Sequence, residues 1–152
     1  MTKVLLPDVL VELICGYLCE YVLLDWIDEN KLNWNRLSGN NNDGAIKLLK
    51  SNITKIYWSE LSTNNNPEAI QLLKENPDHI YWGFLSENNN SEAIAMLKAN
   101  PRRMDYLRLS RNSNLEAIKM LKERSDKIDW YNLSRNPAAI HILEQKIGRA
   151  HV

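Results

Sequence analysis

The chain has 152 residues and a mass of 17.7 kDa, the size of one domain that can bury a sizeable core without disulfides or a metal. Its 19 Lys and Arg balance 19 Asp and Glu, and this net charge of zero excludes a uniformly basic nucleic-acid binder and an acidic disordered chain. Five Trp and 19 Asn stand beside a single Phe, which indicates that Trp and Asn organise the chain in a fixed way.

The most apolar stretch, residues 4–27, is not typical of a signal peptide or a membrane span. It contains four acidic residues, which are costly in a bilayer and interrupt the apolar core of a signal peptide: Asp8, Glu12, Glu20 and Asp25. Cys15 and Cys19 lack the second pair of ligands that a zinc site needs, so we expect two reduced, buried thiols. The sequence therefore predicts a soluble, cytoplasmic protein with no membrane partner, metal or cofactor.

Residues 6–18 predict an amphipathic helix, within an N-terminal capping segment, 1–31, that shields the adjoining part of the chain. The pattern of this helix is carried by Leu6, Pro7, Leu10, Ile14, Tyr17 and Leu18. It resembles the opening of an F-box, the helical module by which substrate adaptors bind the Skp1 subunit of cullin-type ubiquitin ligases. The resemblance implies that these six residues face Skp1.

From residue 32 onward the chain repeats with a period of 24. An aromatic residue opens each unit, at Trp34, Trp58, Trp82, Tyr106 and Trp130. Leu follows three residues later, then Ser, and then Asn two residues further on. An Ala-Ile pair and an apolar-apolar-Lys run keep this register in four units. We therefore predict a repeat domain over 32–145, with four full units and a truncated fifth.

Each unit predicts two short helices. Asn66 precedes Pro67, and this pair starts a helix because the Asn side chain can accept a bond from a free backbone N–H while Pro loses nothing at the first helical position. An apolar stripe follows, and Asn76-Pro77 ends the helix after about nine residues. The other half of the unit, from 80 to 86, predicts a short α-helix or a partly 3₁₀ helix.

Helices of two or three turns are not stable alone, so these units must bury their faces against their neighbours. The predicted fold class is all-α: an α-solenoid with an N-terminal capping segment. Residues that are identical in every unit are expected to pack or to cap, with Trp between layers and with Asn and Ser bonding the loop backbone.

The positions that vary among the units are better candidates for binding a partner. They are the second residue after the aromatic and the residue after Ser. We predict that a protein partner contacts the repeat surface at Arg36, Glu60, Phe84, Arg108, Asn132, Glu87, Arg111 and Arg135.

The repeats also resemble a family. The pattern W-x-x-L-S-x-N-x-x-x-x-A-I-x-L-L-x-x-N-P over residues 32–145 is similar to tandem repeats in proteins of large DNA viruses of protists, where an F-box-like N-terminus often precedes them. The unit length and the Asn-Pro pairs are also similar to the leucine-rich variant repeat, a superhelix of alternating α and 3₁₀ helices. The viral resemblance implies a protein–protein interaction scaffold in the host cytoplasm or nucleus, and a substrate adaptor that redirects host ubiquitination.

No motif indicates catalysis. A glycine-rich phosphate loop, an H-E-x-x-H pair and a nucleophile elbow are all missing from the sequence, so we expect neither enzyme activity nor a small-molecule substrate. The alternative to a protein-binding scaffold is a structural or nucleic-acid-binding helical-repeat protein without a ubiquitin link, because Lys and Arg gather in the third and fourth units. Acidic residues interleaved with them favour a salt-bridged surface instead.

The last six residues, 147–152, depart from the repeat. They look like a translation of the start of a common short-read sequencing adapter. We expect 146–152 to be a non-native tail, and the natural protein to continue past Gln145 with more repeats.

Overall fold

A computed structural model describes residues 28–140 of the chain. Contacts divide the chain into two compact bodies, Met1–Leu32 and Asn33–Val152, and each is described by itself. In the first body the described residues form one 3₁₀ turn, η1 (Glu29–Lys31), which Asp28 caps by accepting a bond from the backbone N–H of Asn30. The predicted helix at 6–18, both cysteines and the tail at 146–152 lie outside the described residues.

The second body is built from the 24-residue units, which we number from their aromatic residues: 34–57, 58–81, 82–105, 106–129 and 130–140. A short α-helix opens each unit: α2 (Trp34–Ser38), α4 (Trp58–Thr63), α6 (Trp82–Leu85), α8 (Tyr106–Leu109) and α10 (Trp130–Ser134). A nine-residue α-helix follows in four units: α3 (Asp43–Ser51), α5 (Pro67–Glu75), α7 (Ser91–Ala99) and α9 (Leu115–Glu123). Residues 28–140 are therefore all-helical, with no strand, as predicted.

The first four units each contain a third element that the sequence did not predict. A 3₁₀ turn follows the long helix: η2 (Ile53–Lys55), η3 (Pro77–His79), η4 (Pro101–Arg103) and η5 (Ser125–Lys127). In the fifth unit a 3₁₀ turn, η6 (Pro137–Ala139), follows α10. In the second and third units an Asn-Pro pair ends the long helix, as predicted, but Pro77 and Pro101 then occupy the first position of a new turn. The fixed φ of proline suits that position, and its missing N–H is not needed there.

The long helices begin at a capping Asn. The side chains of Asn42, Asn66, Asn90 and Asn114 accept a bond from the backbone N–H two residues later, at 2.8 to 2.9 Å. This confirms the predicted helix starts. The ends are capped as well, because the side-chain amides of Asn52, Asn76 and Asn100 donate to the carbonyl four residues earlier.

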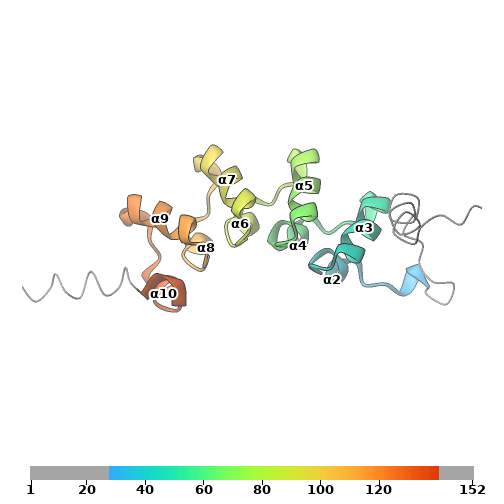
Figure 1. Cartoon of the computed structure of the whole chain (residues 1–152), viewed down its shortest axis with the longest axis horizontal. Coiled ribbons are helices and arrows are strands. Elements are labelled where there is room, and N and C mark those ends of the chain that lie inside the picture. Colours follow the sequence, from blue (N-terminus) through green and yellow to red (C-terminus); the bar gives the residue numbers. More distant parts are fainter. Residues whose placement is uncertain (1–27, 141–152) are drawn as a thin grey trace, which may run out of the picture. The chain divides into compact units, whose positions relative to one another are not determined.

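The core lies between the two sets of helices. The Ala-Ile pair and most of the following apolar residues of each long helix are buried, together with the Leu of the short helices at Leu61, Leu85, Leu109 and Leu133. Each long helix contacts the long helix of the next unit, and α2, α4 and α6 contact one another in sequence. Figure 1 shows α3, α5, α7 and α9 following one another beside the shorter helices.

In the second to fifth units, a buried Asn bonds to the unit before it. The side-chain Nδ2 of Asn88 donates to the carbonyls of Ser62 and Asn64 at 3.0 and 2.9 Å, and its Oδ1 accepts from the N–H of Asn90 at 2.9 Å. Asn88 is 1% exposed. The same three bonds recur at Asn64, Asn112 and Asn136. This slot therefore satisfies loop carbonyls across the boundary between units.

The Ser slot makes a second recurring set of bonds. The hydroxyl of Ser62 donates to the carbonyl of Trp58 at 2.7 Å and accepts from the backbone N–H of Tyr81, the last residue of the same unit, at 3.1 Å. Ser38, Ser86 and Ser110 make the equivalent pair of bonds. The prediction that Ser and Asn bond the loop backbone is confirmed for these residues.

The aromatic slot packs at the edge of the core. Trp34, Trp58 and Trp82 are half-buried against it, and each ring meets a cationic or aromatic side chain from the 3₁₀ turn of its own unit. The Trp58 and His79 rings are stacked with centroids 4.5 Å apart, while Lys55 Nζ lies 4.6 Å from the ring centroid of Trp34. These three Trp residues therefore pack against the core, but at its edge and not between layers as predicted, and Trp130 is 37% exposed.

Ion pairs join successive long helices at a spacing of 18 residues. Lys50 pairs with Glu68, Lys74 with Glu92, and Lys98 Nζ lies 2.7 Å from a carboxylate oxygen of Glu116. Lys119 is a second partner of Glu116, at 2.5 Å. Hydrogen bonds from Lys119 and Lys98 lower the pKa of Glu116 from 4.5 to about 2.

Replacing Glu116 with Gln is expected to remove a pH-dependent contribution to stability. Because the pKa of Glu116 is about 2 in the folded chain and 4.5 without these partners, its stabilisation is complete above pH 4.5 and is lost as the pH falls toward 2. The difference in urea midpoint between wild type and Glu116→Gln should therefore shrink over that range. A difference that stays constant from pH 4.5 to pH 2 would contradict this assignment.

Candidate functional site

The predicted partner-binding positions of the repeats occupy two slots in each unit, which together we call the variable row. It comprises the second residue after each aromatic and the residue after each Ser: Arg36, Gly39, Glu60, Thr63, Phe84, Glu87, Arg108, Arg111, Asn132 and Arg135. The two positions of a unit are three residues apart on or just after a short helix, so they lie on the same face. The row thus follows the short helices and does not include the long ones.

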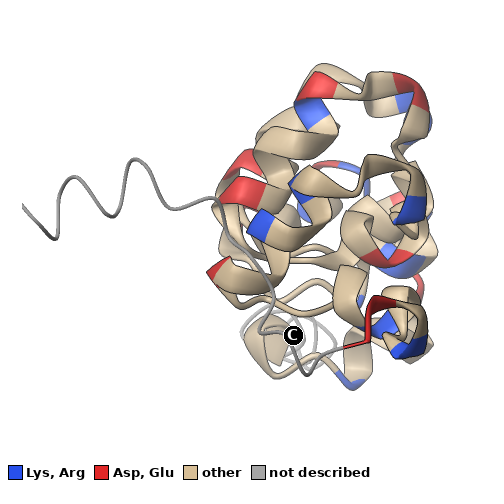
Figure 2. Ribbon diagram, turned by 90° about the vertical axis from the view of Figure 1, so that its right-hand side faces the viewer, with Lys and Arg blue, Asp and Glu red and all other residues tan. Residues whose placement is uncertain are grey.

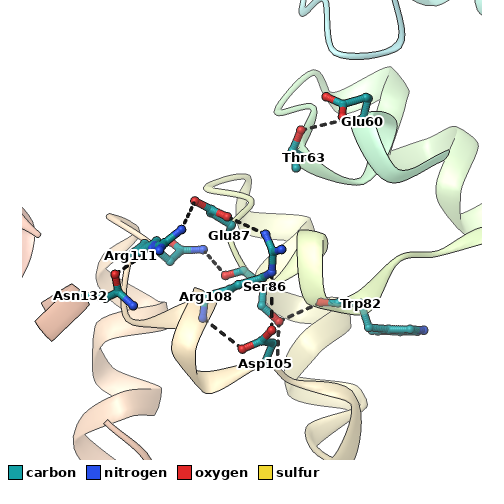
Figure 3. Close-up of polar contacts among 10 residues, drawn as sticks. Glu60, Thr63, Trp82, Ser86, Glu87, Asp105, Arg108, Arg111 and Asn132 are labelled. Atoms are coloured by element: carbon teal, nitrogen blue, oxygen red, sulfur yellow. Dashed lines mark hydrogen bonds and ion pairs between the residues drawn. The ribbon is translucent and has the colours of Figure 1, made fainter. Parts of the chain in front are cut away.

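Glu87 joins the row between the third and fourth units (Figure 3). Its carboxylate lies 3.1 Å from Nη1 of Arg108 and 3.9 Å from Nη1 of Arg111. The guanidinium of Arg108 also lies 4.2 Å from the ring centroid of Phe84 and 3.5 Å from Oδ2 of Asp105. These side chains, half-buried except for the exposed Arg111, form one connected cluster of aromatic and charged groups.

Arg111 extends the cluster to the fifth unit, because its Nε donates to Oδ1 of Asn132 at 2.9 Å (Figure 3). Asn132 is only 7% exposed, and its side chain holds Arg111 in place. Arg135 is exposed, lies over the ring of Tyr131 and donates to its hydroxyl at 3.0 Å. The predicted residues from 84 to 135 therefore lie together across three units.

The first two units contribute less to this cluster. Glu60 is half-buried, and its carboxylate lies over Gly39 of the first unit, 3.6 Å from where a Cβ on that glycine would be. Thr63 donates to the backbone carbonyl of Glu60 at 2.8 Å, and Figure 3 shows this pair apart from the Glu87 cluster. Arg36 is exposed.

The predicted Skp1-binding residues Leu6, Pro7, Leu10, Ile14, Tyr17 and Leu18 lie outside the described residues, so their role stays a prediction. Within residues 28–140, no group of three or more His, Cys, Asp or Glu side chains could hold a metal ion. No helix in the same range is long and apolar enough to cross a membrane.

Basic and acidic residues are interspersed over the described helices (Figure 2). Several of the bases that gather in the third and fourth units pair with acids: Lys98 and Lys119 with Glu116, Arg108 with Glu87 and Asp105, and Arg124 with Asp126 at 3.6 Å. Such pairing lowers the positive field that a phosphate backbone needs. The arrangement therefore favours a mixed-charge surface.

The sequence analysis did not predict a set of pockets that lie beside the aromatic slot. A pocket of about 490 Å³ is lined by residues that include Trp82, Met96 and Arg103, and one of about 380 Å³ is lined by residues that include Tyr106 and Met120, the equivalents of Trp82 and Met96. The signal that the sequence did carry is the recurrence of the aromatic and of a Met fourteen residues later, at Met96 and Met120.

Comparison of the chain with known protein families, curated proteins and solved structures found no match.

Proposed function

We propose that the repeats form an α-solenoid that binds a protein partner through the variable row. The observation that supports this most is the contact chain from Phe84 and Arg108 through Glu87 to Arg111 and Asn132, which makes one surface from three units. The identical positions are engaged in packing and in bonds between units. The varying positions are thus the ones whose side chains can differ without disturbing the fold.

The repeated bonds support the solenoid part of the proposal. Every unit from the second to the fifth donates its buried Asn amide to the same two carbonyls of the preceding unit. Since each short helix is too small to be stable alone, stacking on neighbours supplies the burial that the units need.

The chemistry of the row favours a protein partner over nucleic acid. Arginine and aromatic side chains are enriched in the contacts that dominate protein interfaces, and Arg108 lies on the ring of Phe84. Arg108 also forms an ion pair with Glu87, which reduces the positive charge that it could offer to a phosphate backbone. An adaptor role through Skp1 is implied by the F-box resemblance of the N-terminal segment and stays a prediction.

Peptides selected from a random library on the immobilised full chain test this proposal. We expect Phe84→Ala combined with Arg108→Gln to weaken the selected peptides by about tenfold or more, since central aromatic and Arg contacts carry most binding energy. A matched control combines Gln71→Ala with Arg102→Gln, at exposed positions outside the variable row. Equal affinity of the selected peptides for both variants would contradict the proposal.

A further inference from the structure

The boundary between the fourth and fifth units differs in charge from the one before it. At the earlier boundary, the carboxylate of Glu87 lies 3.1 Å from Arg108 and 3.9 Å from Arg111. One period later, Arg111 stands in the slot of Glu87, Asn132 in that of Arg108, and Arg135 in that of Arg111. The later boundary therefore has two arginines where the earlier one has an acid between two arginines.

A pocket of about 300 Å³ opens at this boundary. It is lined by Arg111, Ser113, Asn132, Arg135, Asn136 and Pro137, and among these lining residues there is no acid. Two arginines thus line one small hollow, together with the hydroxyl-bearing Ser113.

The hollow exists because a ladder of Asn side chains stops here. Asn41, Asn65 and Asn89 each accept a bond on Oδ1 from the backbone N–H one unit later, at 3.2, 2.9 and 3.0 Å. The next residue in this slot is Ser113, and its counterpart one unit later is Pro137, which has no N–H to donate. The smaller side chain at 113 leaves space where an amide would otherwise stand.

The arginines keep donors for an outside group. A guanidinium has five N–H donors, and Arg111 gives Nε to Asn132 and approaches Glu87 only at 3.9 Å with Nη1. Arg135 gives Nη1 to the hydroxyl of Tyr131. The remaining N–H groups can bind a carboxylate, which arginine recognises by paired hydrogen bonds.

We propose that this pocket binds the carboxylate of an Asp or Glu side chain from a protein partner. The carboxylate takes the part that Glu87 plays between Arg108 and Arg111 one unit earlier. This inference rests on the proposed function, because it names the chemistry that the partner presents to the last part of the variable row.

Fluorescein-labelled hexaglutamate, titrated into the full chain at low salt, tests the pocket directly. We expect Arg111→Gln combined with Arg135→Gln to weaken binding by roughly tenfold or more, because charge-assisted bonds are lost. The control, Arg102→Gln with Lys127→Gln, removes the same charge from exposed positions elsewhere and should weaken binding less than about threefold, through screened long-range charge alone. Circular dichroism checks that all variants are folded.

A second variant leaves the charge unchanged. Ser113→Asn restores the larger side chain of the other units and is expected to weaken hexaglutamate binding by narrowing the pocket. Wild-type affinity in Ser113→Asn, or equal losses in the two charge variants, would overturn the proposal. So would displacement of the probe by inorganic phosphate at lower concentrations than by glutamate, or tighter binding of a single-stranded oligonucleotide through the same arginines.

The two proposals can fail separately. If library-selected peptides bind through Phe84 and Arg108 but hexaglutamate binds equally well without Arg111 and Arg135, only the proposal of a carboxylate-binding pocket is wrong. If hexaglutamate requires both arginines while no selected peptide depends on Phe84 or Arg108, the pocket stands and the wider binding row fails.

Discussion

Replacing Asn88 with Ala is expected to lower the free energy of unfolding by about 3 kcal/mol, because two buried carbonyls and one N–H lose their partner and each unsatisfied group costs roughly 1–3 kcal/mol. Asn88 is 1% exposed and bonds to Ser62, Asn64 and Asn90. Urea unfolding followed by circular dichroism measures the change.

The matched control for this substitution is the next residue. Asn89 is exposed, and its side chain accepts one bond, from the N–H of Ser113. Since water can replace that bond, Asn89→Ala should cost less than about 1 kcal/mol. Similar losses in the two variants would mean that the buried Asn slot does not hold successive units together.

Leu85→Ala is expected to destabilise the chain by about 3–5 kcal/mol, the range for large cavities in a packed core. Leu85 is completely buried in α6, the short helix of the third unit, and belongs to the continuous core. Deleting its side chain weakens the contacts of α6 with the neighbouring helices α4 and α7. Unfolding in urea again gives the magnitude.

Leu107→Ala is the matched control, because it makes the same chemical change at a surface position of the next unit. Leu107 is 49% exposed, so its truncation should cost less than about 1 kcal/mol. A loss of the same size in Leu85→Ala and Leu107→Ala would contradict the placement of Leu85 in the core and of Leu107 at the surface.

The parts of the fold that could be predicted from the sequence are those set by local chemistry. A capping Asn before Pro67 and an apolar stripe of helical period fix a nine-residue helix, because both depend only on neighbours in the chain. The 3₁₀ turn after each long helix was missed. Asn76-Pro77 predicts the end of the long helix, but Pro77 is also well suited to the first position of the 3₁₀ turn that follows.

Bonds between units were predicted in kind but not in detail. The period of 24 indicates that Asn88 has the same role as Asn64, but not that its amide spans two carbonyls of the preceding unit. Which carbonyls accept these bonds depends on how the loops of neighbouring units stack, and the repeat pattern in the sequence does not specify that stacking. The solenoid arrangement stays a prediction for the same reason.

The candidate site shows a similar limit. Variation among the units predicted the same partner-binding role for Arg108, Arg111 and Asn132. In the structure, however, Asn132 is buried and accepts a bond from Arg111, and Arg108 forms an ion pair with Glu87. Variation indicates that a slot tolerates change, whereas exposure depends on the side chains of adjacent units. The pocket at Ser113 was missed because its cause, a ladder that ends at Pro137, combines two residues a full period apart.

The location of the binding surface is tested most directly by amide NMR spectra of the labelled full chain, titrated with a library-selected peptide. The variable row predicts that the largest shift changes fall on the short helices and the residues just after them, at 83–87, 107–111 and 131–135. Changes concentrated on the long helices α5, α7 and α9, or around the pockets beside Trp82 and Tyr106, would contradict it.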